Sequence, residues 1–297
     1  MDSDELPLGR STIDRDALIR TDPRELRRVW ADPRLQMMHV SGSDVAVRGE
    51  RLELTEVPGE VRASGGESLT WAYLGKDHLG PVIAAVHLAR EAGRAWANLR
   101  TVGALLPGRE AGLATAAVAL ANWHATHTHC PRCGAATTIT ASGWVRVCPV
   151  DNSEHFPRTD AAVIMAIIDS FDRILLAHNA MWPANRFSVP AGYVEPGEPL
   201  EAAVRREVWE ETAIRVGRVA YQGSQPWPFP ASLMVAFRGE ALNAEPIADG
   251  EEITEVRFFT RAELAHAVAA GDLLLPGATS IARSLIEDWY GGPIPGA

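Results

Sequence analysis

The sequence contains few cysteines, and all of them lie in one short stretch. Cys130, Cys133 and Cys148 are the only three among 297 residues, which argues against a framework of several disulfides. Basic residues are also in deficit: 28 Lys and Arg stand against 38 Asp and Glu, so the formal net charge is -10. Non-specific binding of nucleic acid requires clustered positive charge, and this balance disfavours it. A polyanionic small substrate remains compatible, because a bound metal ion inverts the local charge.

Long apolar runs are missing as well. No run reaches the roughly 20 residues that a membrane-spanning helix requires. Charged residues such as Arg10 and Asp14 interrupt the first thirty residues, which lack the apolar segment of a secretory signal. We therefore expect a cytoplasmic protein in a reducing environment, without a membrane partner.

Residues 1–125 predict an N-terminal α+β domain that is rich in short strands. Helices are expected at 24–30 and, in an alanine-rich stretch, at 112–127. Strand-like segments separated by Gly, Ser, Pro or Asp are found at 35–40, 44–49, 51–57, 69–75 and 81–89. His78 and His87 look isolated and are interpreted as packing or surface residues. Because no catalytic constellation is visible, a structural or dimerising role is predicted.

Residues 126–157 carry a cysteine pattern typical of a zinc ribbon. Cys130 and Cys133 form a Cys-x-x-Cys knuckle followed by Gly, and Cys148 follows fourteen residues later. Asp151 stands where a fourth cysteine would complete the pattern. Carboxylate oxygen is an accepted zinc ligand, so Asp151 is the first candidate for the fourth position. The alternative is a ribbon that keeps its fold and has lost the metal.

Other residues of this region offer weaker interpretations. His155 is the second candidate for the fourth zinc ligand. Three further histidines cluster near the end of the alanine-rich helix, at His124, His127 and His129. Histidines near a helix C-terminus are commoner as partners of its dipole than as ligands. A nucleic-acid-binding ribbon is disfavoured, because Arg132, Arg146 and Arg158 are too few.

Residues 158–297 predict an α/β or α+β layered domain, with strands interleaved with helices. The apolar run 161–168 suits a central buried strand. Further strands are expected at 173–178, 218–222, 233–237 and 256–259. A helix is expected at 261–270, with Thr260 as its N-cap and Glu263 completing a capping box, and another at 280–289.

Within this domain, residues 192–214 carry three glutamates on one side of a predicted helix. Glu207, Glu210 and Glu211 fall within about 100° of one another, and three repelling carboxylates call for a reason. A solvated acidic stripe is the usual meaning of such a run. Here the apolar side chains that begin at Leu200 share the same side. A hard divalent cation such as Mg²⁺ or Mn²⁺, bound through carboxylate oxygen, is therefore the better interpretation.

The same stretch resembles the Nudix box, a pattern of fixed residues at fixed spacing. Its places are filled by Gly192, Glu198, Arg206, Glu207, Val208, Glu210, Glu211, Ala213 and Ile214. Only Ala213 departs, because it replaces the late glycine. It lies beyond the acids, so the departure concerns the exit from the helix rather than the metal ligands. Glu198 is expected to pair with Arg206.

A second motif narrows the resemblance. Residues 224–232, SQPWPFPAS, resemble an array of the NADH pyrophosphatase branch of the Nudix hydrolases, and the preceding ribbon also fits that branch. The resemblance implies an α+β protein with a Nudix α/β/α sandwich that hydrolyses the pyrophosphate of NAD(H) to NMN(H) and AMP. Removal of NAD caps from RNA 5′ ends and a non-catalytic nucleotide-sensing module are the alternatives. Trp227 and Phe229 suit packing and a pocket wall equally.

The resemblance also implies the catalytic metal site. Glu207, Glu210 and Glu211 would bind Mg²⁺ or Mn²⁺, helped by a backbone carbonyl of Ala191 or Gly192. Glu211 would also orient or deprotonate the attacking water. Glu252 is the expected distal metal ligand, whereas its neighbours Glu251 and Glu255 are interpreted as surface charge.

The substrate contacts follow from the same resemblance. Phe156 and Tyr193 match aromatic places that sandwich a base, with one of the pair supplied by a second subunit. A homodimer is therefore implied. Gln225 and Ser232 match contacts to the nicotinamide mononucleotide half, and Ala282 matches a backbone contact to the nucleotide.

Overall fold

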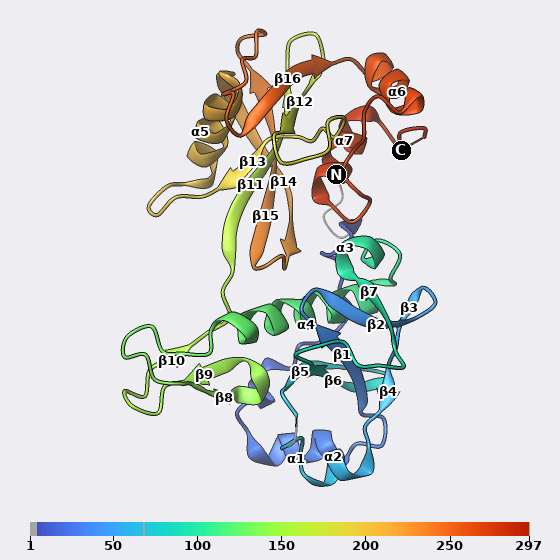
Figure 1. Cartoon of the computed structure of the whole chain (residues 1–297), viewed down its shortest axis with the longest axis vertical. Helices are drawn as coiled ribbons and strands as arrows, with labels where there is room; N and C mark the ends of the chain where they lie inside the picture. The colour runs from blue at the N-terminus through green and yellow to red at the C-terminus, as the bar shows by residue number, and fades with distance from the viewer. Residues whose placement is uncertain (1–4, 68, 297) are drawn as a thin grey trace. The chain divides into compact units, whose positions relative to one another are not determined.

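The computed structural model describes residues 5–67 and 69–296 (Figure 1). These residues form two compact units. The first contains residues 10–159 together with 226–231, and the second contains 160–225, 232–296 and the described part of the first nine residues. The polar start expected of the chain lies partly outside the described residues, at 1–4. The three-part division at 125 and 157 stays a prediction.

The first unit is built on a mixed β-sheet. The strand order is β3-β2-β1-β6-β5, with β4 beside β1 and β7 beside β2. Among the described strand pairs of this sheet, β1 and β6 are parallel and the others are antiparallel. The strands are β1 (Gln36–Ser41), β2 (Asp44–Arg48), β3 (Arg51–Leu52), β4 (Thr55–Glu56), β5 (Trp71–Asp77), β6 (Gly80–Val86) and β7 (Ala95–Asn98).

This unit has helices at the two places where the sequence predicts them, 24–30 and 112–127, and two short helices that the sequence did not suggest. These helices are α1 (Pro23–Ala31), α2 (Gly59–Ala63), α3 (Leu99–Val102) and α4 (Gly108–Thr126). The side chain of Asp22 caps α1 by accepting from the backbone N–H of Arg24. The alanines of α4, such as Ala114 and Ala117, are fully buried, and their small size lets the helix lie close along the sheet (Figure 1).

His87 is not isolated in the folded unit, contrary to its appearance in the sequence. Its Nε2 lies 2.9 Å from Nδ1 of the buried His39, and its Nδ1 lies 3.4 Å from a carboxylate oxygen of Glu91. Burial lowers the pKa of His39 to about 4 and lowers the pKa of His87 from its usual value. The two imidazoles are therefore neutral at pH 7 and join β1 to the end of β6.

The ribbon is a small antiparallel sheet in the order β10-β9-β8. Its strands are β8 (Thr138–Thr140), β9 (Val145–Val147) and β10 (Glu154–His155). Two tight turns bring the cysteine-bearing loops at its ends together.

The second unit is an α/β/α sandwich around a sheet in the order β14-β15-β11-β12-β16, with β13 beside β11. Its central strand β11 pairs in parallel with β15 and antiparallel with β12 and β13. The strands are β11 (Asp160–Ile168), β12 (Ile174–Asn179), β13 (Ala191–Tyr193), β14 (Val216–Trp227), β15 (Ser232–Ala241) and β16 (Ile253–Phe259). The helices are α5 (Leu200–Thr212), α6 (Arg261–Ala270) and α7 (Ile281–Tyr290).

The apolar run of β11 fills both faces of the sandwich. Val163 and Met165 point to a core shared with α5, whereas Ile164 and Ala166 point to a core shared with α6 and α7. The helices accordingly lie on opposite faces of the sheet (Figure 1). The capping box of α6, between Thr260 and Glu263, forms as predicted. The expected mixed α+β class with a layered C-terminal domain is confirmed.

Candidate active site

Helix α5, which packs on one face of the sheet, carries the three glutamates. Val204 and Val208 are fully buried in the core and fix the rotation of the helix. The helix ends at Ala213, which caps it in the left-handed conformation with φ 55°. Glycine adopts this conformation without steric strain. The departure from the box therefore falls at the helix exit, as predicted.

Gly192 lies directly against the first glutamate. A Cβ atom on Gly192 would stand 1.9 Å from Cδ of Glu207, so the Glu207 carboxylate would have to move away. The strand β13 thus needs glycine at this place so that the Glu207 carboxylate can rest on its backbone. This close approach gives the first residue of the box a physical purpose.

Arg206 organises the acidic cluster. Its guanidinium makes a bidentate pair with Glu198, at 2.9 Å from Nε and 2.8 Å from Nη2, so the predicted pairing is confirmed. Nη1 also donates to Glu207 at 2.8 Å and to Glu210 at 3.1 Å, and Nη2 donates to the carbonyl of Tyr193. One side chain therefore ties the loop, the helix and two of the three acids together.

Glu211 is the most perturbed carboxyl of the cluster. Its side chain is 7% exposed, and Oε2 is buried without a hydrogen-bond partner. Burial, followed by the negative charges of Glu207 and Glu252, raises the pKa of Glu211 to about 8. Burial also raises the pKa of Glu207, against the lowering effect of Arg206.

A divalent cation fits this set of groups. An orphaned, buried carboxylate oxygen beside several like charges is stabilised by a cation that takes oxygen ligands. The charge of Glu252 contributes to the raised pKa of both Glu207 and Glu211, so the expected distal ligand lies within electrostatic reach of the helix.

The structure brings two of the expected substrate residues into contact. The hydroxyl of Tyr193 lies 3.2 Å from Oγ of the buried Ser232, while 57% of the Tyr193 side chain remains exposed. The backbone N–H of Ala282 donates to Oγ of Ser280, which caps α7, at 3.3 Å.

Gln225 takes a place that the sequence did not suggest. Its side chain is fully buried. Oε1 accepts from the backbone N–H of Leu8 at 3.1 Å, and Nε2 donates to the carbonyl of Thr279 at 3.0 Å. The amide therefore braces the second unit internally, and its polar atoms already have partners.

Trp227 and Phe229 belong to the first unit together with the middle of the proline-rich array. Their rings meet edge to face at 4.8 Å. The guanidinium of Arg100 lies 4.2 Å from the Phe229 ring centre and 5.2 Å from that of Trp227. Asn122 donates to the carbonyl of Pro228 at 2.7 Å. Sequence reasoning missed Arg100, because no spacing rule links it to residues more than a hundred positions away.

Phe156 follows the last ribbon strand. Its ring is 62% exposed, so a large aromatic surface is open to solvent there.

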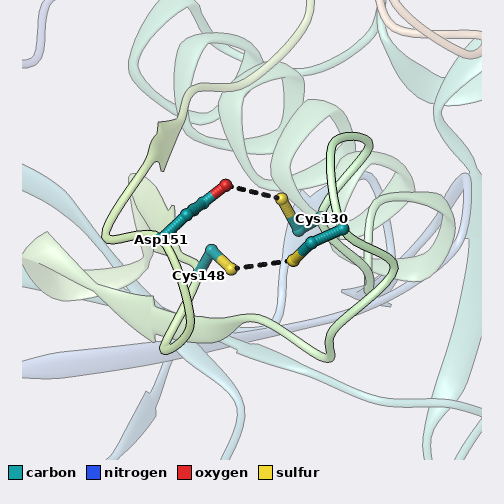
Figure 2. A group of neighbouring side chains, drawn as sticks. Cys130, Cys148 and Asp151 are labelled. Atoms are coloured by element: carbon teal, nitrogen blue, oxygen red, sulfur yellow. Dashed lines mark hydrogen bonds between the residues drawn. The ribbon is translucent and has the colours of Figure 1, made fainter.

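The ribbon brings its three thiols and Asp151 together. Sγ of Cys130 lies 3.7 Å from Oδ2 of Asp151, and Sγ of Cys133 lies 3.5 Å from Sγ of Cys148. Figure 2 shows the side chains of Cys130, Cys148 and Asp151 pointing toward one another. The four candidate ligand atoms lie within 4.8 Å of one another, close to the spacing of about 3.8 Å between sulfurs around tetrahedral zinc. All three cysteines are free.

The surroundings favour the anionic forms of Cys130 and Asp151, whereas burial raises the pKa of the Cys148 thiol to about 11. Burial alone would raise the pKa of Cys130, but backbone N–H groups of Arg132 and Cys133 and the side chain of Ser153 lower it to about 6. Hydrogen bonds from Ser153 hold the pKa of Asp151 well below its usual range. Both bonds fall on Oδ1, at 2.9 Å from the backbone nitrogen and 2.6 Å from Oγ, so Oδ2 is the oxygen that faces Cys130. The cluster is consistent with a zinc ribbon.

His124 and Arg146 make structural hydrogen bonds near the ribbon. His124 is buried and its Nε2 bonds the carbonyl of Gly143 at 2.9 Å, while Nδ1 lies 3.1 Å from Nη1 of Arg146. Burial lowers the pKa of His124 to about 4. Arg146 is itself buried and also donates to Thr137. These residues stiffen the ribbon from inside.

Known proteins match the chain along nearly its whole length. A family model described as the NUDIX domain matches residues 157–276, and one described as the NADH pyrophosphatase zinc ribbon domain matches residues 125–156. The NAD-capped RNA hydrolase NudC of Mycobacterium bovis (strain BCG / Pasteur 1173P2) is 38% identical over 304 residues, which cover 95% of this chain and 94% of that protein. NudC of Mycobacterium tuberculosis (strain ATCC 25618 / H37Rv) gives the same values.

A further relative matches a shorter part of the chain. The NAD-capped RNA hydrolase NUDT12 of Homo sapiens is 38% identical over 196 residues, covering 62% of this chain and 42% of that protein. The sandwich, the acidic helix and the ribbon together define a Nudix catalytic domain with a zinc-ribbon module. The chain belongs to the Nudix hydrolase family, in the NudC-type branch that carries the NADH pyrophosphatase zinc ribbon.

Across residues 5–67 and 69–296, every helix is too short or too polar to cross a membrane.

Proposed function

We propose that this enzyme hydrolyses the pyrophosphate bond of NAD(H), giving NMN(H) and AMP, with a divalent cation held by the glutamates of α5. The observation that carries the proposal is the buried, unpartnered oxygen of Glu211 at the centre of an otherwise bonded acidic cluster. The names of relatives that match 95% of the chain support an NAD-type substrate. The array at 224–232 supports the same class.

The residues take distinct roles in this proposal. Glu207, Glu210, Glu211 and Glu252 hold Mg²⁺ or Mn²⁺, which supplies charge neutralisation of the pyrophosphate and an activated water. Glu211 orients the attacking water and accepts its proton, since its carboxylate is the one without a competing hydrogen bond. Arg206 keeps Glu207 and Glu210 in place through the bonds described above.

Substrate recognition is assigned to residues outside the acidic cluster. The exposed rings of Tyr193 and Phe156 offer stacking surfaces for a base. Ser232 contacts the nicotinamide mononucleotide half beside Tyr193. Because the side-chain amide of Gln225 is already bonded on both atoms, its contact to the substrate is made by backbone, as is that of Ala282. A homodimer that shares the aromatic pair, and a cytoplasmic location, remain proposals.

The ribbon is proposed to hold one structural Zn²⁺ through Cys130, Cys133, Cys148 and Asp151. The convergence of their ligand atoms supports this set. His155 bonds Ser153 at 3.1 Å through Nε2, and the group of converging ligand atoms contains Asp151 and not His155. The N-terminal domain is proposed to have a structural or dimerising role.

Removal of NAD caps from RNA 5′ ends uses the same chemistry, and the relatives' names favour it specifically. Turnover of NADH and of NAD-capped RNA should be compared at equal Mn²⁺ concentration, with Glu211→Gln as the inactive control. We expect the wild type to cleave at least one substrate and the variant neither. A non-catalytic, nucleotide-sensing protein would cleave neither substrate in either form, and that result would remove the proposed activity.

A further inference from the structure

Glu252 stands alone among the four acids in approaching the cluster from outside helix α5. It lies just before β16, on a stretch that is exposed to solvent. An exposed glutamate has several rotamers of similar energy, and holding one of them costs conformational entropy. A ligand at such a place needs support, and the support comes from another strand.

Asn179, the last residue of β12, provides that support. Its Nδ2 donates to Oε1 of Glu252 at 3.1 Å. Its Oδ1 accepts from the backbone N–H of Met181 at 2.9 Å, which fixes the amide so that the NH₂ group faces the glutamate. The next residue, Ala180, donates its backbone N–H to the carbonyl of Glu252 at 2.9 Å. Side chain and backbone of Glu252 are thus both held by the end of β12.

The strand pairing is shaped to allow this contact. The register between β12 and β16 shifts between His178, which faces Glu255, and Asn179, which faces Ile253. Such bulges re-aim a side chain and are enriched beside active sites. The loop before β16 is closed by Asp249, whose Oδ1 accepts from the backbone N–H groups of Glu251 at 2.6 Å and Glu252 at 2.8 Å.

We propose that Asn179 is a positioning residue that orients the carboxylate of Glu252 toward the catalytic cation. The inference rests on the proposed function, because it takes Glu252 as a metal ligand. By holding Oε1, the neutral amide leaves Oε2 for the cation and brings no positive charge to compete with it. Arg206, in contrast, binds Glu207 and Glu210 with a full charge. Hydrogen-bond partners behind metal ligands typically change metal affinity or activity by about 10–100-fold when removed.

The test is a calorimetric titration of purified full-length protein with Mn²⁺, for wild type, Asn179→Ala, Glu252→Ala and the double variant. Zinc of the ribbon is left in place, and NADH turnover against Mn²⁺ concentration is measured in parallel. We expect Asn179→Ala to weaken Mn²⁺ binding about tenfold and to raise the Mn²⁺ concentration for half-maximal turnover by a similar factor. In the background of Glu252→Ala, the same substitution should change Mn²⁺ affinity less than twofold.

Asn243→Ala is the matched control. Asn243 also bridges backbone groups in the second unit, accepting from Arg215 at 2.7 Å and donating to Ala213 at 3.2 Å, so its loss removes a comparable pair of hydrogen bonds. We expect Mn²⁺ affinity to be unchanged in this variant.

Three results would overturn the inference. If Asn179→Ala binds Mn²⁺ as tightly as the wild type does, Asn179 does not position Glu252, although Glu252 can still be a ligand. An equal loss with and without Glu252 would show that Asn179 acts elsewhere. Unchanged affinity in Glu252→Ala would remove the ligand itself. A wild type that does not cleave NADH would instead contradict the proposed function. The Mn²⁺ titration would still show whether Asn179 contributes to Mn²⁺ binding.

Discussion

Replacing Glu211 with glutamine is predicted to abolish catalysis and yet to stabilise the metal-free protein at alkaline pH. Burial and the surrounding acids raise the pKa of Glu211 from 4.5 to about 8 in the folded state. Well below pH 4.5 the carboxyl is protonated in both the folded and the unfolded state, so its raised pKa does not lower the free energy of unfolding. As pH rises toward 8, the unfolded chain releases this proton and the folded chain keeps it, so stability falls. Above pH 8 the carboxyl is ionised in both states, and the free energy of unfolding is lowered by the full cost of the buried charge.

Each unit by which the folded-state pKa of Glu211 exceeds its unfolded-state pKa lowers the free energy of unfolding by about 1.4 kcal/mol at high pH. The charged carboxylate therefore costs at most about 5 kcal/mol of stability. Glutamine removes this charge but buries an amide with an unmatched donor, which costs about 1–3 kcal/mol. We therefore expect Glu211→Gln to raise the free energy of unfolding by roughly 2–4 kcal/mol at pH 8.5 and to leave it unchanged, or lower it by up to about 2 kcal/mol, at pH 5. The pH dependence distinguishes this effect from a general change in packing.

Thermal unfolding followed by calorimetry, in EDTA and from pH 5 to 9, measures the effect. As pH rises, the unfolding temperature of the second unit should fall more steeply in the wild type than in the variant. Added Mn²⁺ should raise this temperature appreciably only in the wild type. Glu201→Gln, an exposed position on the same helix, is the control and should follow the wild type. If Glu211→Gln is no more stable than the wild type at pH 8.5, the account of a repelled, desolvated carboxylate is wrong.

Further predictions concern the helix, its loop and the ribbon. Gly192→Ala should lower kcat/KM about 100-fold or more, because its Cβ would displace Glu207; near-normal turnover would contradict the close approach. Ala213→Gly should raise the free energy of unfolding by about 1 kcal/mol, because glycine adopts the left-handed conformation of this residue without strain. Chemical denaturation measures this change, and a lower free energy of unfolding in the variant would contradict the prediction. Cys148→Ser should lower zinc content from about one ion per chain to near zero by elemental analysis, and a wild type without zinc would favour a ribbon that has lost its metal.

The sequence revealed those parts of the site that depend on local spacing. The central strand was visible as the apolar run 161–168, because a strand buried on both faces needs apolar residues at every position. The pair of Glu198 and Arg206 was predictable from eight residues of separation across one loop and helix. The strained exit at Ala213 was visible as a departure from a glycine.

Contacts between distant segments were not predictable in the same way. His39 and His87 are 48 positions apart, and Asn179 and Glu252 are 73 positions apart. Gln225 is braced by Leu8 across 217 positions, so its buried side chain could not be foreseen from the array in which it stands. A single sequence carries the period of a helix or strand, but the register between strands and the bulge beside Asn179 arise only when the sheet is assembled.

The products formed from NADH show whether the enzyme cleaves the pyrophosphate bond. Purified protein is incubated with NADH and Mn²⁺, and the products are separated by chromatography and weighed by mass spectrometry. The proposed cleavage between the two phosphates predicts equimolar AMP and NMNH, and no products from Glu211→Gln. Release of nicotinamide with ADP-ribose, or AMP formation that continues in the variant, would contradict it.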